Sequence, residues 1–597
     1  MKRKSRRFWP ILLGVAVLAA AGLYYVVRMF SVDLPSYPKV EKTTWLEQNW
    51  SPSQREWMHH ADQGTVTFSI PYEWLAALEQ PTFTLTAGPP LLSSDYLDRF
   101  GFITADPSGL PVGFAHGGEL VDPKTARPWT NPATDKPLTT VGLTCAACHT
   151  GRFTYNGTAV MIEGGPALTD LGKLRKATGL ALLFTRYAPF RFDRFATAVL
   201  GPQADDAART VLKTQLDKAL AGGRIEVDLD KKVATKSIEE GFGRLDALNR
   251  IGNQVFSLDL DRPENYAAQS APVAFPHIWD TSWFDWVQYN ASIMQPMVRN
   301  AGEALGVRAF INLAKPEQPL FASTVNVDTI FAIEQQLAGE QPTAETGFTG
   351  LRPPRWPSDL LGPINTELVD MGAALYADRC QGCHLPPVGS EGFWDQKHWT
   401  DENSARERYL RVPTIKIEKI GTDPAQAQGM AERKVKLPSE LGIDTDSFGA
   451  ALGQLVAKTS ARWYDSQTPP VPPERREIMN GNRQNGIQAP LAYKARPLDG
   501  IWATPPFLHN GSVPTIDALL SPVSERPKTF WLGNREYDPE KLGYRTDELR
   551  GGFKFDTSKP GNSNAGHEFS DNPGPGVIGA ALKPDERAAL IAYLKTL

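Results

Sequence analysis

The chain has 597 residues, too many for one small module, so two or three domains are expected. Its 50 Gly and 49 Pro indicate long loops, whereas 15 Trp, 16 Tyr and 27 Phe supply enough core material to exclude a disordered chain. Residues 1–30 carry six basic and no acidic side chains, which leaves 57 basic and 67 acidic residues, a net charge of −10, for the rest. This acidic body does not favour a phosphate-binding surface, so no nucleic-acid partner is expected.

An uncharged stretch, residues 8–27, follows the basic tip. Twenty helical residues at about 1.5 Å each span the roughly 30 Å hydrocarbon core of a membrane. The preceding basic residues keep the N-terminus cytoplasmic, so we expect a periplasmic body anchored to the inner membrane by this helix. The alternative is a signal peptide cleaved after the small residues 19–21, which leaves a soluble periplasmic or secreted protein.

The next part of the chain mixes loops with regular segments. Residues 141–144 read as strand or loop, and Asn156-Gly157 predicts a hairpin turn. The pattern over 166–222 is helical and is expected to end at Gly222-Gly223. An aromatic-rich stretch in 272–310 is followed by a helix that Pro296 opens.

Four prolines between residues 353 and 363 mark a linker. Beyond them an amphipathic helix over 367–379, with Met371 and Tyr376 on one face, runs into Cys380. The chain closes with a helix over 584–594 that begins at Pro584 and has two acids in its first turn. Both helices are typical of a cytochrome c domain.

All four cysteines belong to two C-x-x-C pairs, each followed at once by a histidine: Cys145, Cys148 and His149, then Cys380, Cys383 and His384. This is the attachment pattern of haem c. Two thiols three residues apart form thioethers with one haem, and the adjacent histidine coordinates its iron. A redox dithiol or half a zinc site is the alternative for a lone pair, but two such motifs in an exported chain favour two covalently bound haem c groups.

The second axial ligand of each iron decides what the haem can do. His567 lies in a Gly-rich loop before the last helix, where a cytochrome c domain supplies its second ligand, and is expected opposite His384. For the His149 haem no second ligand is evident, which favours an open or displaceable position. Arg299 and Glu303 share a face of the helix that Pro296 opens and are candidates for charge stabilisation and proton transfer, or for a structural ion pair.

The sequence resembles the di-haem cytochrome c peroxidase family, in its long branch, which is related to the rubber oxygenases and to the methylamine dehydrogenase maturation enzyme. The resemblance rests on both haem motifs and on the segments 275–280, 299–303, 421–424, 498–512 and 566–569. It implies that oxidant binds at the N-terminal haem and that the C-terminal haem relays electrons. It also implies a calcium ion between the haems, at a position that these residues do not specify.

The expected fold is mainly α with extensive loops and a few short strands. Two cytochrome c-like haem domains with large insertions follow an N-terminal transmembrane helix. The expected units are the basic tip and anchor or signal (1–30), an N-terminal extension (31–140), the first haem domain (141–352), and the second (365–597) with an insertion at about 400–560.

Three functions are consistent with these features. The first is a periplasmic peroxidase that reduces hydrogen peroxide with electrons from a small cytochrome or a quinol-linked donor. The second is a haem-dependent oxygenase that uses dioxygen on an apolar substrate, as rubber oxygenases do. The third is a non-catalytic electron-transfer cytochrome.

Overall fold

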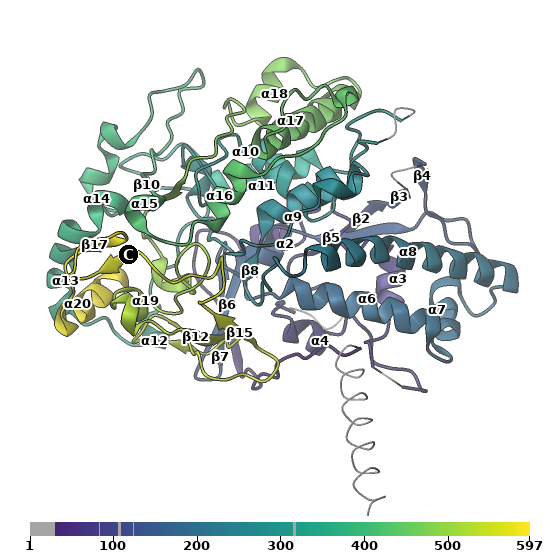
Figure 1. The fold of residues 1–597 in the computed structure, drawn as a ribbon, viewed down its shortest axis with the longest axis horizontal. Helices are drawn as coiled ribbons and strands as arrows, with labels where there is room; N and C mark the ends of the chain where they lie inside the picture. Colours follow the sequence, from purple (N-terminus) through teal and green to yellow (C-terminus); the bar gives the residue numbers. More distant parts are fainter. Residues whose placement is uncertain (1–29, 83, 105–108, 123–124, 315–317) are drawn as a thin grey trace, which may run out of the picture.

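The computed structural model describes residues 30–82, 84–104, 109–122, 125–314 and 318–597 (Figure 1). The predicted membrane span, residues 8–27, lies outside these ranges, and no helix within them is long and apolar enough to cross a membrane. The expected fold class, mainly α behind a transmembrane helix, is therefore wrong, since only 38% of the structure is helical. The many Pro and Gly residues explain this, because Pro removes a helical hydrogen-bond donor and Gly destabilises helix interiors.

A small sheet positions the first haem motif. Strand β1 (Lys42–Trp45) lies parallel to β7 (Thr158–Glu163), which pairs with the antiparallel β6 (Thr150–Tyr155). The predicted turn joins β6 to β7, and Asn156 and Gly157 both have positive φ, as this tight hairpin requires. The predicted strand before the motif is also confirmed: β5 (Thr139–Leu143) pairs with β2 (Phe114–Glu119) and leads directly into the first cysteine.

Three helices form one side of the molecule, drawn in blue at the right of Figure 1: α6 (Leu171–Tyr187), α7 (Arg191–Leu200) and α8 (Asp206–Val233). The expected end at Gly222-Gly223 is wrong, because α8 continues to Val233. Two such glycines cost roughly 2 kcal/mol of helix propensity. Buried Leu229 and the ion pairs of Arg175 with Glu226 and Asp230 hold the extra turns and offset that cost.

The middle of the chain packs around the helix that Pro296 opens, α10 (Pro296–Gly306), as predicted. A core of Ile, Leu, Val and Phe side chains joins α10 to segments on both sides of it in the sequence. These are α9 (Ala247–Asn253) with the π-helical turn η1 (Gln254–Asp259), α11 (Val327–Ala338), α16 (Ala425–Glu432) and α17 (Phe448–Ser466).

The second haem motif follows α13 (Thr366–Arg379), which packs against the last helix, α20 (Pro584–Leu594), at the left edge of Figure 1. Both predicted helices are confirmed. The two backbones come very close at Gly372, where an added Cβ would lie 2.1 Å from the carbonyl oxygen of Ala589. Tyr376 is buried as expected, whereas Met371 on the expected apolar face is 37% exposed.

The other elements are short and lie along the loops. The α-helices are α2 (Pro52–His59), α3 (Tyr72–Ala77), α4 (Ser94–Arg99), α12 (Ser358–Leu361), α15 (Ile417–Ile420), α18 (Pro473–Met479) and α19 (Ile516–Leu519). The strands are β3 (Val121–Asp122), β4 (Arg127–Pro128), β8 (Arg244–Leu245), β9 (Val273–Ala274), β10 (Thr414–Lys416), β11 (Ala492–Lys494), β12 (Thr529–Leu532), β13 (Tyr537–Asp538), β14 (Gly543–Tyr544), β15 (Phe553–Asp556), β16 (Glu568–Phe569) and β17 (Val577–Gly579).

Candidate functional site: two haem motifs on one cavity

The first motif forms a single helical turn, α5 (Ala146–His149), between β5 and β6. The Nδ1 atom of His149 lies 2.8 Å from the carbonyl oxygen of Pro276. Donation from Nδ1 to that carbonyl fixes the ring and leaves Nε2 free to bind a metal, as is usual for ligating histidines. Burial lowers the pKa of His149 to about 4, so the imidazole is neutral, the form that coordinates iron.

The second motif repeats this arrangement on α14 (Gln381–His384), directly after α13. The Nδ1 atom of His384 lies 2.8 Å from the carbonyl oxygen of Arg496. Burial again lowers the pKa of the histidine. Each motif histidine, His149 and His384, thus has its ring oriented by a main-chain carbonyl from a distant part of the chain.

The structure places the ring of His567 next to that of His384 in the second motif. The ring centroids of His384 and His567 are 6.2 Å apart, and their planes meet at 64°. A metal–imidazole bond is about 2 Å long, so one iron fits between two rings at this spacing. Nδ1 of His567 is buried and has no hydrogen-bond partner among the described residues. Burial, reinforced by the nearby His384, lowers its pKa to about 3, which keeps it neutral.

The loop that carries His567 is fixed by its main chain. The His567 N–H donates to the carbonyl of Ile420 at 2.8 Å, and the Arg526 guanidinium donates to the carbonyls of Gly566 and His567, both at 2.8 Å. An added Cβ at Gly566 would lie 2.3 Å from the carbonyl carbon of Gly421. This close contact, with a positive φ at Gly566, explains why glycine precedes the histidine.

Both motifs line one cavity of about 540 Å³. The four cysteines, His149, His384 and His567 all contribute to its wall. Burial raises the pKa of the Cys145 and Cys380 thiols to about 12, so neither behaves as a reactive thiolate. The donor set therefore fits two haem groups: a thiol pair and an oriented histidine at each position, and a second imidazole at one of them.

The predicted catalytic pair lies on α10, at the side of the cavity near the first motif. The carboxylate of Glu303 accepts a 2.9 Å hydrogen bond from Nε2 of Gln288, and burial raises its pKa above the ordinary value. Arg299 instead forms a 2.6 Å ion pair with Glu334, which also accepts from the Asn300 amide at 2.9 Å. Arg299 and Glu303 thus share a face and a cavity, as expected, but each has another partner.

The remaining histidines have varied roles in the structure. Nε2 of His59 contacts the Glu163 carboxylate at 2.9 Å, and Nδ1 of His60 contacts the Phe114 carbonyl at 2.8 Å. His277 and His509 line the cavity, where the ring of His509 stacks on Tyr493 at 3.9 Å between centroids. Met297 is part of the α10 core.

Gln288, Lys494 and Arg496 also line the cavity, although they were not among the site residues predicted from the sequence. Lys494 is the last residue of β11, and Arg496 follows two residues later. Residues two apart in a strand share a face, so this pair of basic residues was the signal from which they could have been predicted. Within the described ranges, no group of three or more His, Cys, Asp and Glu side chains could hold a metal ion unaided. The predicted calcium ion accordingly stays without assigned residues.

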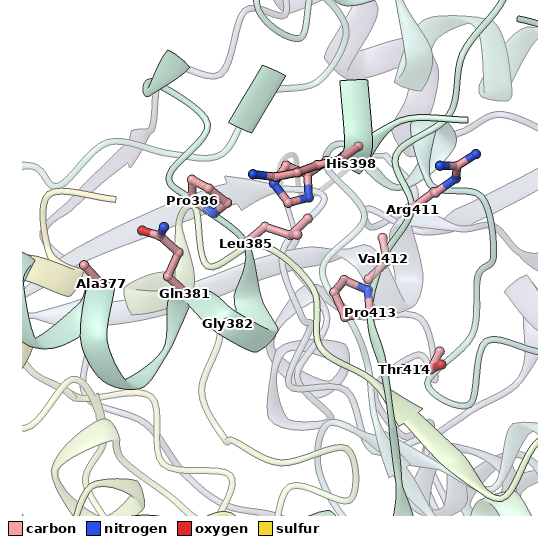
Figure 2. Close-up of a pocket in the computed structure, with 11 residues that line it drawn as sticks. Ala377, Gln381, Gly382, Leu385, Pro386, His398, Arg411, Val412, Pro413 and Thr414 are labelled. Atoms are coloured by element: carbon pink, nitrogen blue, oxygen red, sulfur yellow. The ribbon is translucent and has the colours of Figure 1, made fainter. Parts of the chain in front are cut away.

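A second, more open pocket of about 630 Å³ lies beside the second motif. Figure 2 shows Gln381 and Gly382, the residues between the two cysteines, on one side and the segment Arg411–Thr414 on the other. Lys397 and Arg411 are its cationic residues, and its lining among the described residues includes no Asp or Glu.

Comparison with known proteins agrees with this site. A family model described as RoxA-like, cytochrome c-like, matches residues 492–531. This segment supplies Tyr493, Lys494, Arg496 and His509 to the cavity wall. The match implies haem c binding and fits a relationship to the rubber oxygenases.

Two relatives come from Sinorhizobium fredii. The uncharacterized protein y4iM is 44% identical over 341 residues, which cover 48% of this chain and 68% of that protein. The uncharacterized protein y4iJ is 89% identical over 597 residues, the full length of both chains. With this identity along its whole length, the chain belongs to the same family as y4iJ and carries a RoxA-like cytochrome c segment.

Proposed function

We propose that this haem-dependent oxidoreductase holds two haem c groups and reduces hydrogen peroxide at the haem of His149. His384 and His567 would hold the second haem, which would supply electrons to the first. The overall reaction consumes one peroxide, two protons and two electrons and yields two water molecules. An external electron donor, such as a small cytochrome or a quinol-linked protein, supplies the electrons.

The observation that carries the proposal is the Gln288–Glu303 pair beside the first motif. A buried carboxyl with a raised pKa holds its proton at a pH where an exposed glutamate has lost it. Such a group is suited to give a proton to a leaving oxygen, as a general acid. The Gln288 amide fixes one carboxylate oxygen at 2.9 Å and so orients the group in the cavity wall.

When bound, haem c supplies the redox-active iron at each motif. The chain supplies the rest of the site. The Pro276 carbonyl orients His149, and Glu303 holds the proton that O–O cleavage requires. Arg299 adds a positive charge that stays in place because Glu334 holds it at 2.6 Å. At the second motif His384 and His567 would both ligate the iron, which would leave no position for an oxidant and suits a relay.

The pocket of Figure 2 supports the entry of electrons at the second motif. Its wall includes Gln381 and Gly382, which lie between the two haem-attaching cysteines. A donor seated there comes within a few bonds of the second haem. The cations Lys397 and Arg411 favour a donor with an acidic contact surface.

The test is the reaction of the fully reduced protein with hydrogen peroxide, followed at the haem absorption bands. We expect rapid oxidation of both haems by one peroxide. We expect Glu303→Gln to slow it by about 10²–10⁴-fold, the usual contribution of a positioned acid–base group. Glu540→Gln, which changes an exposed carboxylate elsewhere, is the matched control. Unchanged rates in Glu303→Gln would remove that residue from the proposal, and no oxidation of wild type would exclude the peroxidase.

A second candidate, oxygenation of an apolar substrate with dioxygen, is favoured by the RoxA-like match at 492–531. Aliphatic side chains such as Ile251, Val287, Ile333 and Leu337 contribute to the cavity wall. This function predicts a stable dioxygen adduct of the reduced protein and oxygen uptake with a polyisoprene. If the reduced protein reacts with neither peroxide nor dioxygen, a non-catalytic electron-transfer role is favoured instead.

We also propose that the folded part of the chain works in the periplasm, since haem c is attached outside the cytoplasm in bacteria. A reporter that is active only after export, fused behind residue 597, tests this. Activity of the reporter is expected, and its absence would contradict the proposed location.

A further inference from the structure

Lys494 places a basic side chain in the wall of the cavity with no ion-pair partner among the described residues, and burial together with the nearby Arg496 and Arg299 lowers its pKa well below the usual value. It is the last residue of β11, where it pairs with Thr414 of β10, and its main-chain N–H donates to the Tyr289 carbonyl at 2.8 Å. The surface that its side chain retains belongs to the cavity wall. Among the residues that the structure describes, none forms a hydrogen bond or salt bridge with Nζ.

The surroundings of Lys494 are themselves cationic. Its Nζ lies 5.1 Å from the ring centroid of Phe284, and the guanidinium of Arg496 lies 5.4 Å from the same centroid. The acid that attracts it, Asp285, already accepts hydrogen bonds from the N–H groups of Trp286 at 2.8 Å and Val412 at 3.2 Å. An interior cation in this setting is costly unless a further anion joins it.

The nearby arginines, Arg299 and Arg496, do not bring Lys494 the further anion that it requires. Arg299 is held by Glu334, whereas the Arg496 guanidinium donates to two uncharged carbonyls, those of His277 and Trp279, at 2.8 and 3.3 Å. Nε of Arg496 is buried and has no partner among the described residues. Two adjacent basic side chains thus line the cavity, and no carboxylate of the described residues forms an ion pair with either of them.

We propose that Lys494, together with Arg496, binds a propionate carboxylate of the haem that His149 holds. This inference rests on the proposed two-haem cytochrome, because that carboxylate belongs to the cofactor. The first haem is the partner because the Arg496 side chain donates to the carbonyl of His277 at 2.8 Å, next to Pro276, whose carbonyl orients His149. A haem carboxylate would supply the direct ion pair that no described carboxylate forms with these two side chains.

The experiment compares full-length holoprotein with Lys494→Met, which removes the charge at similar size, and Lys494→Arg, which keeps it. The readouts are the propionate-bending bands in the resonance Raman spectrum and the midpoint potential of each haem. In Lys494→Met we expect the bands of the first haem to shift and its potential to fall, because a nearby cation favours the reduced form. Lys494→Arg is expected to keep both close to wild type.

Lys419→Met is the matched control, because Lys419 also lines the cavity but is exposed. Lys494→Gln replaces the methionine variant if that variant does not fold. We expect it to show the same band shift and the same fall in midpoint potential. Unchanged bands and potentials in the neutral variants, or equal shifts in Lys419→Met, would overturn the inference. Neither readout involves peroxide, so the inference about Lys494 can fail while peroxide reduction stands. Peroxide reduction can likewise fail while Lys494 still binds the propionate.

Discussion

The guanidinium of Arg496 donates to the carbonyl of His277 at 2.8 Å, and this contact ties the two haem motifs together. The main-chain carbonyl of Arg496 orients His384, and the residue before His277, Pro276, orients His149. Arg496 therefore orients His384 through its main-chain carbonyl. Through its side chain, Arg496 also supports the segment 276–277 that orients His149.

This arrangement predicts an asymmetric effect of Arg496→Met. The substitution removes the support of the 276–277 segment but keeps the carbonyl that orients His384. We expect the iron–histidine stretching band of the His149 haem to shift in the resonance Raman spectrum of the reduced protein. The spectrum of the second haem is expected to stay unchanged. Equal changes in both haems would contradict the bridging role. So would an Arg496→Lys protein, which keeps a hydrogen-bond donor, if its spectrum were as altered as that of Arg496→Met.

The spacing of His384 and His567 predicts the ligation of the second haem. His567→Ala removes one of two imidazoles that lie 6.2 Å apart between centroids. We expect the low-spin signal of this haem in electron paramagnetic resonance to be lost and replaced by a high-spin signal. His116→Ala, which changes an exposed histidine on β2, is expected to leave the spectrum unchanged. Persistence of the low-spin signal in His567→Ala would show that another residue is the ligand.

Short-range features of the site were predictable from the sequence. The haem motifs, the hairpin at Asn156-Gly157 and the helix that Pro296 opens all depend on neighbouring residues. The hairpin and the helix agree with the structure. The position of His567 was predictable because a cytochrome c domain places a ligand before its last helix, although the contact with His384 spans a long stretch of chain.

Long-range partners were not predictable in the same way. Arg299 forms its ion pair with Glu334 and not with Glu303, and Glu303 is hydrogen-bonded to Gln288. No local sequence pattern specifies either contact. The overestimate of helix has a different origin: the Pro- and Gly-rich segments, which do not favour helix, take up a larger share of the chain than expected. The extension of α8 past two glycines depends on ion pairs with α6 that only the fold brings together.

The contact between α13 and α20 predicts a strong effect at Gly372. In Gly372→Ala the new Cβ would lie 2.1 Å from the Ala589 oxygen and 2.6 Å from Cβ of Tyr593. Separation of the helices is expected to cost about 1–3 kcal/mol of unfolding free energy, as overpacked cores do. Gly179→Ala in α6 is the control, since its Cβ would meet no atom within 4 Å, and it is expected to stabilise by about 1 kcal/mol. Denaturant unfolding of both variants measures the difference, and a Gly372→Ala protein as stable as wild type would contradict the close packing.

Asp259, at the end of the π-helical turn η1, predicts a pH-dependent stability. Its Oδ1 accepts from the Gln254 amide at 2.8 Å, Oδ2 is buried without a partner among the described residues, and burial raises its pKa to about 8. An aspartate in an unfolded chain has a pKa of about 3.9. The folded state therefore binds the proton more tightly, and the stability that this gives is complete below pH 4 and is lost as the pH rises to 8.

Asp259→Asn cannot ionise, so it is expected to escape this loss. The difference in unfolding temperature, Asp259→Asn minus wild type, should increase from pH 4 to pH 8 and stay constant above pH 8. Asp261→Asn, an exposed neighbour, is the control and is expected to follow wild type at every pH. Thermal unfolding of the three proteins at pH 5 and pH 8 measures the effect. An Asp259→Asn protein with the same pH dependence as wild type would show that this carboxyl does not titrate in this range.

The pocket beside the second motif predicts how an electron donor is selected. Arg411→Glu reverses a charge in the wall of the pocket that includes Gln381 and Gly382 (Figure 2). We expect it to slow reduction of the second haem by an acidic small cytochrome c, because complementary charges mainly raise the association rate. Reduction by a basic small cytochrome c should not slow in the same way. The difference between wild type and variant should shrink as salt is added, since salt screens exposed charges. Stopped-flow reduction at low and high ionic strength measures these rates. If the variant slows both cytochromes equally, or neither, electrons enter at another surface, and the pocket has no part in donor selection.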